Sequence, residues 1–579
     1  MESLPKHLQK YVVEQNYKKY TPVEQASWRY ILRQLKAFLS VHAHESYVEG
    51  LEKTGISIDT IPRIEDISAK LKEFGWRAIP VSGFIPPAAF MELQSLGVLP
   101  IASDMRTLDH LLYTPAPDIV HEAAGHAPIL TQPEFAEYLR QYAQIAKKAI
   151  ISKEDIEMYE AIRDLSDLKE ASDSTAEKIA AAESRLDKVT KSMGHISEAS
   201  ELGRMNWWTA EYGLIGDLKN PKLFGAGLLS SVGEAKFCLS DKVKKIPLTV
   251  DCIRHGYDIT EPQPQLFVTP DFKSLPKVLK EMADQMAFRK GGLSSLQKII
   301  QAESVNTVQL NSGIQISGIL AEVLTPPHPS QEIAYLKFKG PSQLSFADHE
   351  LQGHGIEYHF EGFGTPIGKL KMFPSICPSK LSDSQWDKLS AAPGKTMKLE
   401  FTSGVVVTGL FNGRVEQEQK TILLSLTEAT ATYHGKVLFD PSWGTYDMAI
   451  GSSVPSVFGG PADRFNYGDT EDFVAARVPQ RAYSEKEKLF HSQYAKVREL
   501  RERDLRGEEL VQSLESVVQI HDKNFENDWL LRLEIFELLK NLAPDAESLK
   551  TVTAKLNELS KTNEKVASMI QDGINHAQL

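Results

Sequence analysis

Two histidines in the segment Thr114–Leu130 have the residue type and spacing of metal ligands. His121 and His126 are five residues apart, Glu122 follows the first, and Gly125 precedes the second. Imidazole nitrogens bind Zn, Cu, Fe and Ni. The pair therefore predicts a metal site that needs at least one further ligand from elsewhere in the chain.

The five-residue spacing argues against a zinc-protease site. In those enzymes the two histidines are four residues apart, about 40° around an α-helix, whereas five residues place them about 140° apart. We therefore expect the helix to end or distort near Gly125, so that His121 and His126 can reach one ion. Asp118, which follows Pro117, is the expected N-cap of this helix.

Glu211 is the candidate for the third ligand. It lies among Trp207, Trp208 and Tyr212, and a carboxylate in such an apolar setting needs a cation nearby. Two histidines and one carboxylate with open positions form the site of non-haem Fe(II) oxygenases. The alternative is a pair of ordinary core histidines. Residue types and spacing favour a metal but do not by themselves select iron.

Length and composition limit the class of protein. The 579 residues predict two to four domains, at roughly 100–200 residues per domain. No apolar run approaches the ~20 residues of a membrane-spanning helix, and the N-terminus lacks a secretory segment, so we expect a cytoplasmic protein without a membrane partner. A net charge of −12 argues against nucleic acid as a partner. The three cysteines show no CxxC spacing, which predicts reduced thiols.

The hydrophobic pattern changes twice along the chain and predicts three domains. Helical periodicity dominates residues 1–300, with a helical hairpin inserted at about 153–196, whose second helix is expected to begin with a capping box of Ser174 and Glu177. Short β-rich runs fill 303–470, with turns at Asn311–Gly313 and Asn412–Gly413. Helical signals return over 480–579, starting with a capping box of Ser484 and Glu487 and continuing in helices at 529–539 and 552–570.

Several ordered motifs resemble one known family. They are Pro117-Asp118-x-x-His121-Glu122-x-x-Gly125-His126-x-Pro128, then Trp207-x-Thr209-x-Glu211-Tyr212-Gly213-Leu214, then the run from Gly225 to Glu234. Their order is similar to that of the pterin-dependent aromatic amino acid hydroxylases, and the similarity covers about residues 10–295. The resemblance implies a mainly α catalytic domain of this type, here followed by a β-rich domain and C-terminal helices.

The resemblance also implies an activity and a set of site residues. The expected reaction is that of a phenylalanine 4-monooxygenase, L-phenylalanine to L-tyrosine, with O2, Fe(II) and tetrahydrobiopterin or a related tetrahydropterin. Hydroxylation of tryptophan or tyrosine is an alternative, as is a binding or structural protein whose main role lies in the β-rich domain. By resemblance the iron ligands are His121, His126 and Glu211; the substrate residues are Arg106, Thr114, Pro117, Trp207, Gly227 and Ser230; and the pterin residues are Gly83, Phe84, Ile85, Phe90 and Glu122.

Four positions depart from the family pattern without removing a ligand. Ala116 replaces a glutamate and Asn206 a tyrosine, while Ala123 and Ala124 replace bulkier residues. These changes could reshape the pocket and so affect which aromatic amino acid it accepts.

A second His-Glu-x-x-Gly-His sequence occurs in the β-rich region, at His349 and His354. Its surroundings are glycine-rich, and we interpret it as a surface loop or hairpin, with a second metal site as the alternative. The C-terminal helices are expected to pack within the chain; an oligomer interface is the other possibility. No motif in this half indicates chemistry.

Overall fold

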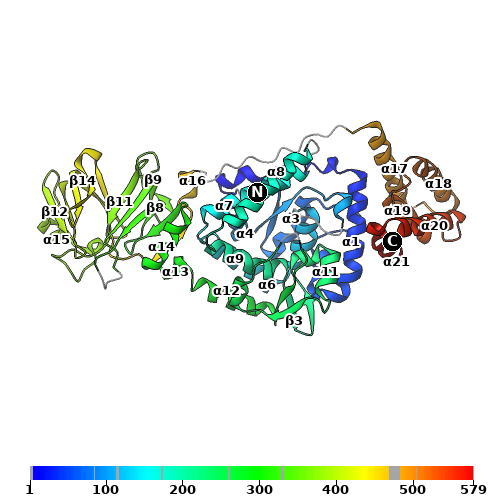
Figure 1. Cartoon of the computed structure of the whole chain (residues 1–579), viewed down its shortest axis with the longest axis horizontal. Coiled ribbons are helices and arrows are strands. Elements are labelled where there is room, and N and C mark those ends of the chain that lie inside the picture. The colour runs from blue at the N-terminus through cyan, green and yellow to red at the C-terminus, as the bar shows by residue number, and fades with distance from the viewer. Residues whose placement is uncertain are drawn as a thin grey trace.

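Figure 1 shows the chain, in a computed structural model, as a central helical body between two smaller ones. A β-rich body lies at one end and the C-terminal helices at the other. The structure describes residues 4–83, 85–111, 117–170, 174–258, 261–327, 332–468, 483–503 and 505–577. Within these ranges, no helix combines the length and apolar character needed to cross a membrane.

The central body is built on one long buried helix, α1 (Pro22–His42). Thr21 and Glu24 form a capping box at its start, and Trp28, Ile31 and Leu35 place its apolar side in the core. The other helices of this body are α2 (Ser46–Lys53), α3 (Ile64–Leu71), α4 (Pro87–Ser95), α5 (Ala127–Ile129), α6 (Pro133–Ala146), α7 (Lys153–Glu170), α8 (Ala176–Ser192), α9 (Glu198–Asn206), α10 (Ala226–Leu229), α11 (Val232–Cys238) and α12 (Leu275–Ala283). Helices α13 (Ala287–Lys290) and α14 (Gly292–Ala302) follow and pack against the β-rich body.

Two small sheets complete the central body. Strands β1 (Arg77–Val81) and β2 (Val98–Ala102) pair in parallel with each other, and α4 connects them along the chain. The second sheet has the order β4-β3-β6-β5, formed by β3 (Leu214–Asp217), β4 (Asn220–Leu223), β5 (Lys244–Pro247) and β6 (Gln265–Thr269). Strand β3 follows directly after the segment that carries Glu211, so the sheet fixes where that segment ends.

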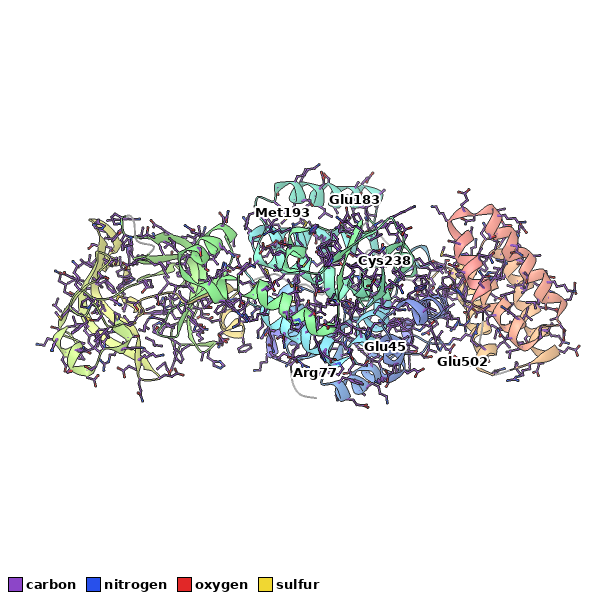
Figure 2. The ribbon with its side chains drawn as sticks, turned by 90° about the horizontal axis from the view of Figure 1, so that it is seen from below. Glu45, Arg77, Glu183, Met193, Cys238 and Glu502 are labelled. Atoms are coloured by element: carbon purple, nitrogen blue, oxygen red, sulfur yellow. The ribbon has the colours of Figure 1, made fainter. Side chains whose placement is uncertain are left out.

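Helices α7 and α8 form an antiparallel pair at the edge of the central body, where Figure 2 labels Glu183 and Met193. The predicted cap at Ser174 is wrong by one residue. Thr175 has the extended backbone of an N-cap, and its hydroxyl accepts the Lys178 N–H at 3.3 Å. The reason is that a cap bonds the amide three residues on, and the backbone turns into the helix at Ala176, not before.

The β-rich body consists of two sheets, with one main hydrophobic cluster centred on each. The first has the order β10-β9-β8-β7-β17, with β11 also on β9; the strands are β7 (Asn306–Gln309), β8 (Ile314–Leu324), β9 (Tyr335–Phe346), β10 (His349–Glu350), β11 (Gly362–Pro366) and β17 (Ser456–Gly459). The second has the order β12-β13-β14-β15, with β16 on β14; the strands are β12 (Thr396–Glu400), β13 (Val405–Gln417), β14 (Lys420–Tyr433), β15 (Lys436–Phe439) and β16 (Tyr446–Ala449). Two short helices, α15 (Asp383–Lys388) and α16 (Arg464–Tyr467), accompany them, and α14 packs its buried residues Leu296 and Ile299 into the core of the first sheet.

The two predicted turns have different outcomes. Asn311–Gly313 does join β7 to β8. Asn412–Gly413 lies inside β13, at a shift in the register between Phe411 and Gly413, and is a bulge instead of a turn. The turn between β13 and β14 is made by Glu418 and Gln419, both at positive φ. The backbone hydrogen bonds between β13 and β14 continue on both sides of the bulge, so β13 runs on past Asn412–Gly413.

The C-terminal helices are α17 (Glu485–Glu502), α18 (Gly507–Asn524), α19 (Leu530–Leu542), α20 (Glu547–Thr562) and α21 (Glu564–Asn575). The Ser484–Glu487 capping box is confirmed at the start of α17. The predicted helix at 552–570 is broken in two at Asn563, whose side chain caps α21.

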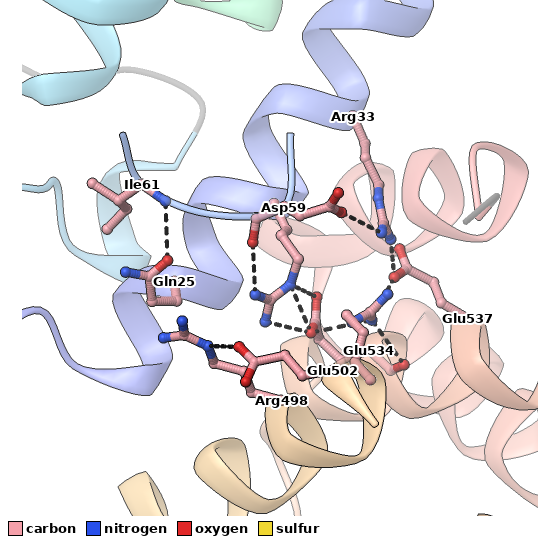
Figure 3. A network of polar contacts seen from close by, with 10 residues as sticks. Gln25, Arg33, Asp59, Ile61, Arg498, Glu502, Glu534 and Glu537 are labelled. Atoms are coloured by element: carbon pink, nitrogen blue, oxygen red, sulfur yellow. Dashed lines mark hydrogen bonds and ion pairs between the residues drawn. The ribbon is translucent and has the colours of Figure 1, made fainter. Parts of the chain in front are cut away.

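Figure 3 shows a buried ion-pair network between α1 and the C-terminal helices. Arg29 donates to both carboxylate oxygens of Glu534, at 2.6–3.0 Å, and Arg33 pairs with Glu537. Arg501 of α17 bridges the two glutamates, at 3.2 and 3.1 Å. These helices therefore pack against the central body of their own chain, in line with the expectation of intrachain packing.

Candidate metal centre

His121 and His126 lie in a π-helix, Val120–His126, instead of an α-helix. The N–H of Ala127 donates to the carbonyl of Glu122, five residues earlier. In such a helix residues five apart are joined by a hydrogen bond and project from the same side, so a five-residue spacing puts both imidazoles on one face. The expected distortion is present, and it extends over the whole segment instead of being confined to Gly125. Asp118 accepts the backbone N–H of His121 at 3.0 Å, as expected of a cap.

Glu211 also comes from a π-helical turn, Trp207–Glu211, which continues α9. The N–H of Tyr212 donates to the carbonyl of Trp207 at 2.8 Å. The wider turn places Asn206 on the same side as Glu211, and the Asn206 amide donates to Glu211 Oε1 at 3.4 Å. Asn206 thus supports the carboxylate at the position where the family has a tyrosine.

The structure brings the three predicted metal ligands together. Nε2 of His121 lies 3.3 Å from Glu211 Oε2, and Nε2 of His126 lies 3.3 Å from Glu211 Oε1. One ligand atom from each residue falls within 4.8 Å of the others. Two nitrogen donors and one carboxylate that converge in this way fit a divalent iron ion and leave coordination positions open.

Ser230 orients the first histidine. Its hydroxyl lies 3.1 Å from His121 Nδ1 and donates to the Ala226 carbonyl at 2.7 Å, so His121 Nε2 is the nitrogen that faces Glu211. Partners of this kind fix the ring orientation of metal-binding histidines. Nδ1 of His126, in contrast, is buried without a hydrogen-bond partner among the described residues.

Two glycines allow the ligand-bearing segments to approach each other. A Cβ on Gly125 would lie 2.6 Å from the Ala226 carbonyl oxygen of α10, and one on Gly225 would lie 2.4 Å from the Glu211 carbonyl oxygen. Gly227, a predicted substrate residue, is packed in the same way against the ring of Tyr212. Gly125 and Gly225 need glycine because backbone meets backbone there, whereas at Gly227 a buried aromatic ring occupies the space.

Burial and charge act oppositely on the two glutamates of the site. Burial disfavours the ionised form of Glu211, but the charge of His126 and hydrogen bonds from both imidazoles outweigh it and hold the pKa of Glu211 well below its usual value. Burial raises the pKa of Glu122 to about 8, with Glu211 and Asp118 adding to the rise and His126 opposing it. One carboxylate therefore carries the negative charge of the site. Oε2 of Glu122 has no hydrogen-bond partner within the described ranges.

Arg106 is fully buried beside the histidines and is held by Asp118. Its Nε and one terminal nitrogen donate to the two carboxylate oxygens of Asp118 at 2.7 and 2.8 Å, and its other terminal nitrogen makes only a 3.4 Å contact with the Ser230 carbonyl. Sequence reasoning assigned Asp118 to helix capping and missed this second role. The arginine is thereby fixed in place with one donor group weakly engaged.

Trp207 stacks on two tyrosines. The rings of Tyr212 and Tyr257 lie 4.6 and 4.2 Å from it, centroid to centroid, at 26° and 9°. The indole N–H is buried with no acceptor among the described residues. A substrate ring that packs flat on Trp207 would have to exchange with one of these tyrosines. Tyr257 was not assigned to the site from the sequence.

Four of the remaining predicted residues, Gly83, Ile85, Phe90 and Pro117, lie in described parts of the chain. Gly83 has a positive φ of 59°, its N–H lies 3.5 Å from Asp104, and Ile85 is buried in a small core that Phe90 joins at its edge. Pro117 is half-buried directly before Asp118. Phe84 and Thr114, and with them Ala116, lie outside the described residues.

The central body is similar to known proteins. The model of the biopterin-dependent aromatic amino acid hydroxylases matches residues 9–162 and 182–293, so the unmatched stretch falls within α7 and α8. A phenylalanine-4-hydroxylase of Mesorhizobium japonicum is 32% identical over 269 residues, covering 46% of this chain and 81% of the relative. One from Pseudomonas aeruginosa is 30% identical over 265 residues, covering 45% and 84%. A solved phenylalanine hydroxylase of Chromobacterium violaceum, with bound iron(III) and 7,8-dihydrobiopterin, has a TM-score of 0.37 at 23% identity over 49% of this chain and 89% of that one.

The chain belongs to the biopterin-dependent aromatic amino acid hydroxylase family. Its central body is the hydroxylase part, and the β-rich body and the C-terminal helices lie beyond the matched residues. The protein is accordingly a pterin-dependent enzyme that hydroxylates an aromatic amino acid.

Proposed function

We propose that the enzyme converts L-phenylalanine to L-tyrosine with O2, Fe(II) and tetrahydrobiopterin, at a centre formed by His121, His126 and Glu211. The observation that supports it best is the convergence of the three ligand atoms within 4.8 Å, from two π-helical segments far apart in the chain. The two relatives described above carry the name phenylalanine-4-hydroxylase, which favours phenylalanine over tryptophan or tyrosine as the substrate.

Arg106 is the group that would hold the amino-acid carboxylate. Asp118 engages one edge of the guanidinium through two hydrogen bonds and leaves the nitrogen that contacts Ser230 at 3.4 Å as the donor for a ligand. A planar guanidinium fixed in this way pre-orients the substrate before reaction. Pro117, Trp207, Gly227 and the undescribed Thr114 would complete the pocket.

The chain positions the reactants and keeps water out. Fe(II), when bound, supplies the redox chemistry that activates O2 together with the pterin. Ser230 holds the ring of His121, and Asn206 supports the Glu211 carboxylate. The buried, unpaired Oε2 of Glu122 offers a polar contact for the pterin, whose ring would lie along Gly83, Phe84 and Ile85 with Phe90 against it.

We also propose that residues 1–300, 303–470 and 480–579 act as separate domains, with the helical insertion at about 153–196. The hydroxylase chemistry belongs to the first, and the ion pairs of Figure 3 attach the third to it.

The test is anaerobic loading of the full chain with Fe(II), followed by turnover with tetrahydrobiopterin, O2 and each of phenylalanine, tyrosine and tryptophan. We expect tyrosine from phenylalanine in a fixed ratio to pterin oxidised, and no product from His126→Ala or Glu211→Ala. If only tryptophan or only tyrosine gave a hydroxylated product, that amino acid would be the substrate instead of phenylalanine. Full turnover in Glu211→Ala would refute the centre, and pterin oxidation without any hydroxylated product would refute the reaction.

A further inference from the structure

A second group of two histidines and a carboxylate lies in the β-rich body. His354 and His359 come from the turn that follows β10, and Asp447 comes from β16 of the other sheet; one ligand atom from each falls within 4.8 Å of the others. The expected partner of His354 was His349, but that residue lies on β10, is exposed, and takes no part in the group. The five-residue spacing of His354 and His359 repeats that of the first site.

The distance between the two histidines fits two ligands of one ion. Nδ1 of His354 lies 3.1 Å from Nε2 of His359, with the rings nearly parallel at 17°. For metal–nitrogen bonds of about 2.0–2.1 Å, the nitrogens are about 3.4 Å apart at a tetrahedral angle and about 2.9 Å at a right angle. The observed separation lies between these values.

Asp447 provides an independent indication of a cation. It is only 6% exposed, and within the described ranges it pairs with no lysine or arginine. The Tyr358 hydroxyl donates a hydrogen bond to Oδ2 of Asp447 at 2.9 Å. A buried carboxylate without a counter-ion is costly, and a cation between the carboxylate and the two imidazoles would supply the missing positive charge.

The backbone holds the two histidines rigidly. The carbonyl of His354 accepts the Leu344 N–H at 2.9 Å, and the carbonyl of His359 accepts the Ser342 N–H at 3.1 Å. Both donors belong to β9, so the ligands are fixed to the first sheet while Asp447 is fixed to the second. An ion bound here would connect the two sheets.

We propose that His354, His359 and Asp447 bind a divalent transition-metal ion such as Zn²⁺, separately from the hydroxylase centre. Tyr358 orients the carboxylate ligand, in the manner of partners that support metal ligands elsewhere. Three protein ligands leave a position for water, and the ion clips the turn after β10 to β16. The site requires neither pterin nor aromatic substrate, and it is independent of the proposed hydroxylase function.

The experiment measures metal binding by the full chain after chelator treatment, with Co²⁺ as a spectroscopic probe and Zn²⁺ for stoichiometry. We expect two equivalents in the wild type and one in Glu211→Ala, which retains only the second site. In the Glu211→Ala background, His359→Ala should weaken the remaining Co²⁺ site at least about ten-fold and change its visible spectrum. His349→Ala is the matched control, since this neighbouring histidine lies outside the group, and it should retain wild-type binding.

Two further measurements keep the test decisive if a histidine variant folds poorly. Asp447→Asn keeps the size of the side chain and should abolish the rise in unfolding temperature that Zn²⁺ produces in the Glu211→Ala protein. His354→Ala with His359→Ala, in the otherwise wild-type chain, should lose one equivalent and keep hydroxylase turnover. A single equivalent in the wild type, or a second equivalent that survives both histidine substitutions, would show that the histidines only hydrogen-bond each other.

Discussion

Replacement of Gly125 by alanine tests whether the π-helix and α10 must touch for the iron centre to form. The added Cβ would lie 2.6 Å from the Ala226 carbonyl oxygen, whereas ordinary contact begins at 3.4 Å, so the two segments must separate by about 0.8 Å. Backbone lies on both sides of this contact, and no flexible side chain can move aside. The separation acts on the His121–Ser230 contact, because α10 leads into Ser230.

The substitution Gly125→Ala is expected to have a large effect on iron binding and turnover. Metal ligands tolerate deviations of about 0.2 Å, and a misplacement of about 1 Å costs roughly 100-fold in rate. We therefore expect kcat/KM to fall roughly 100-fold, about 2.7 kcal/mol of transition-state stabilisation, together with weaker Fe(II) binding. Competition against a chromogenic chelator measures the binding, and pterin-coupled turnover measures the rate.

Gly203→Ala is the matched control. Gly203 lies in α9, and a Cβ there meets nothing within 4 Å, so alanine should stabilise the helix by about 0.5–1 kcal/mol and leave iron binding unchanged. If Gly125→Ala bound Fe(II) and turned over as the wild type does, the close approach of the two segments would not be what positions the ligands.

Three further substitutions test single contacts. Ser230→Ala removes the hydroxyl beside His121 Nδ1 and should weaken Fe(II) binding about 10–100-fold in the same competition assay; unchanged affinity would mean that the ring is held by other contacts. Arg106→Lys cannot reproduce the paired hydrogen bonds to Asp118, so KM for phenylalanine should rise at least about ten-fold while Fe(II) stoichiometry stays the same. Glu534→Ala leaves the buried Arg29 without its carboxylate partner and removes one of the two partners of Arg501, so it should lower the free energy of unfolding by about 3–5 kcal/mol in urea; a loss below about 1 kcal/mol would contradict the role assigned to the network.

Much of the centre follows from local sequence. The types and spacing of His121 and His126 indicate a metal and exclude a regular α-helix between them, because the angle between the side chains depends only on the helix geometry. The aromatic neighbours of Glu211 mark it as the third ligand. Likewise the alternation of residues reveals most strands of the β-rich body, although the bulge at Asn412 shows that a local turn signal yields to a long ladder.

Other features depend on contacts between distant parts of the chain and could not be predicted from the sequence. Nothing near Arg106 in sequence shows that Asp118 holds it, nor that Tyr257 covers Trp207. Asp447 lies 88 residues beyond His359 and on another sheet, so the second site exists only where the two sheets meet. Sequence determined which side chains can bind a metal, whereas packing of the backbone decided which of them converge, because convergence requires glycines, turns and strands that bring remote segments within a few ångströms.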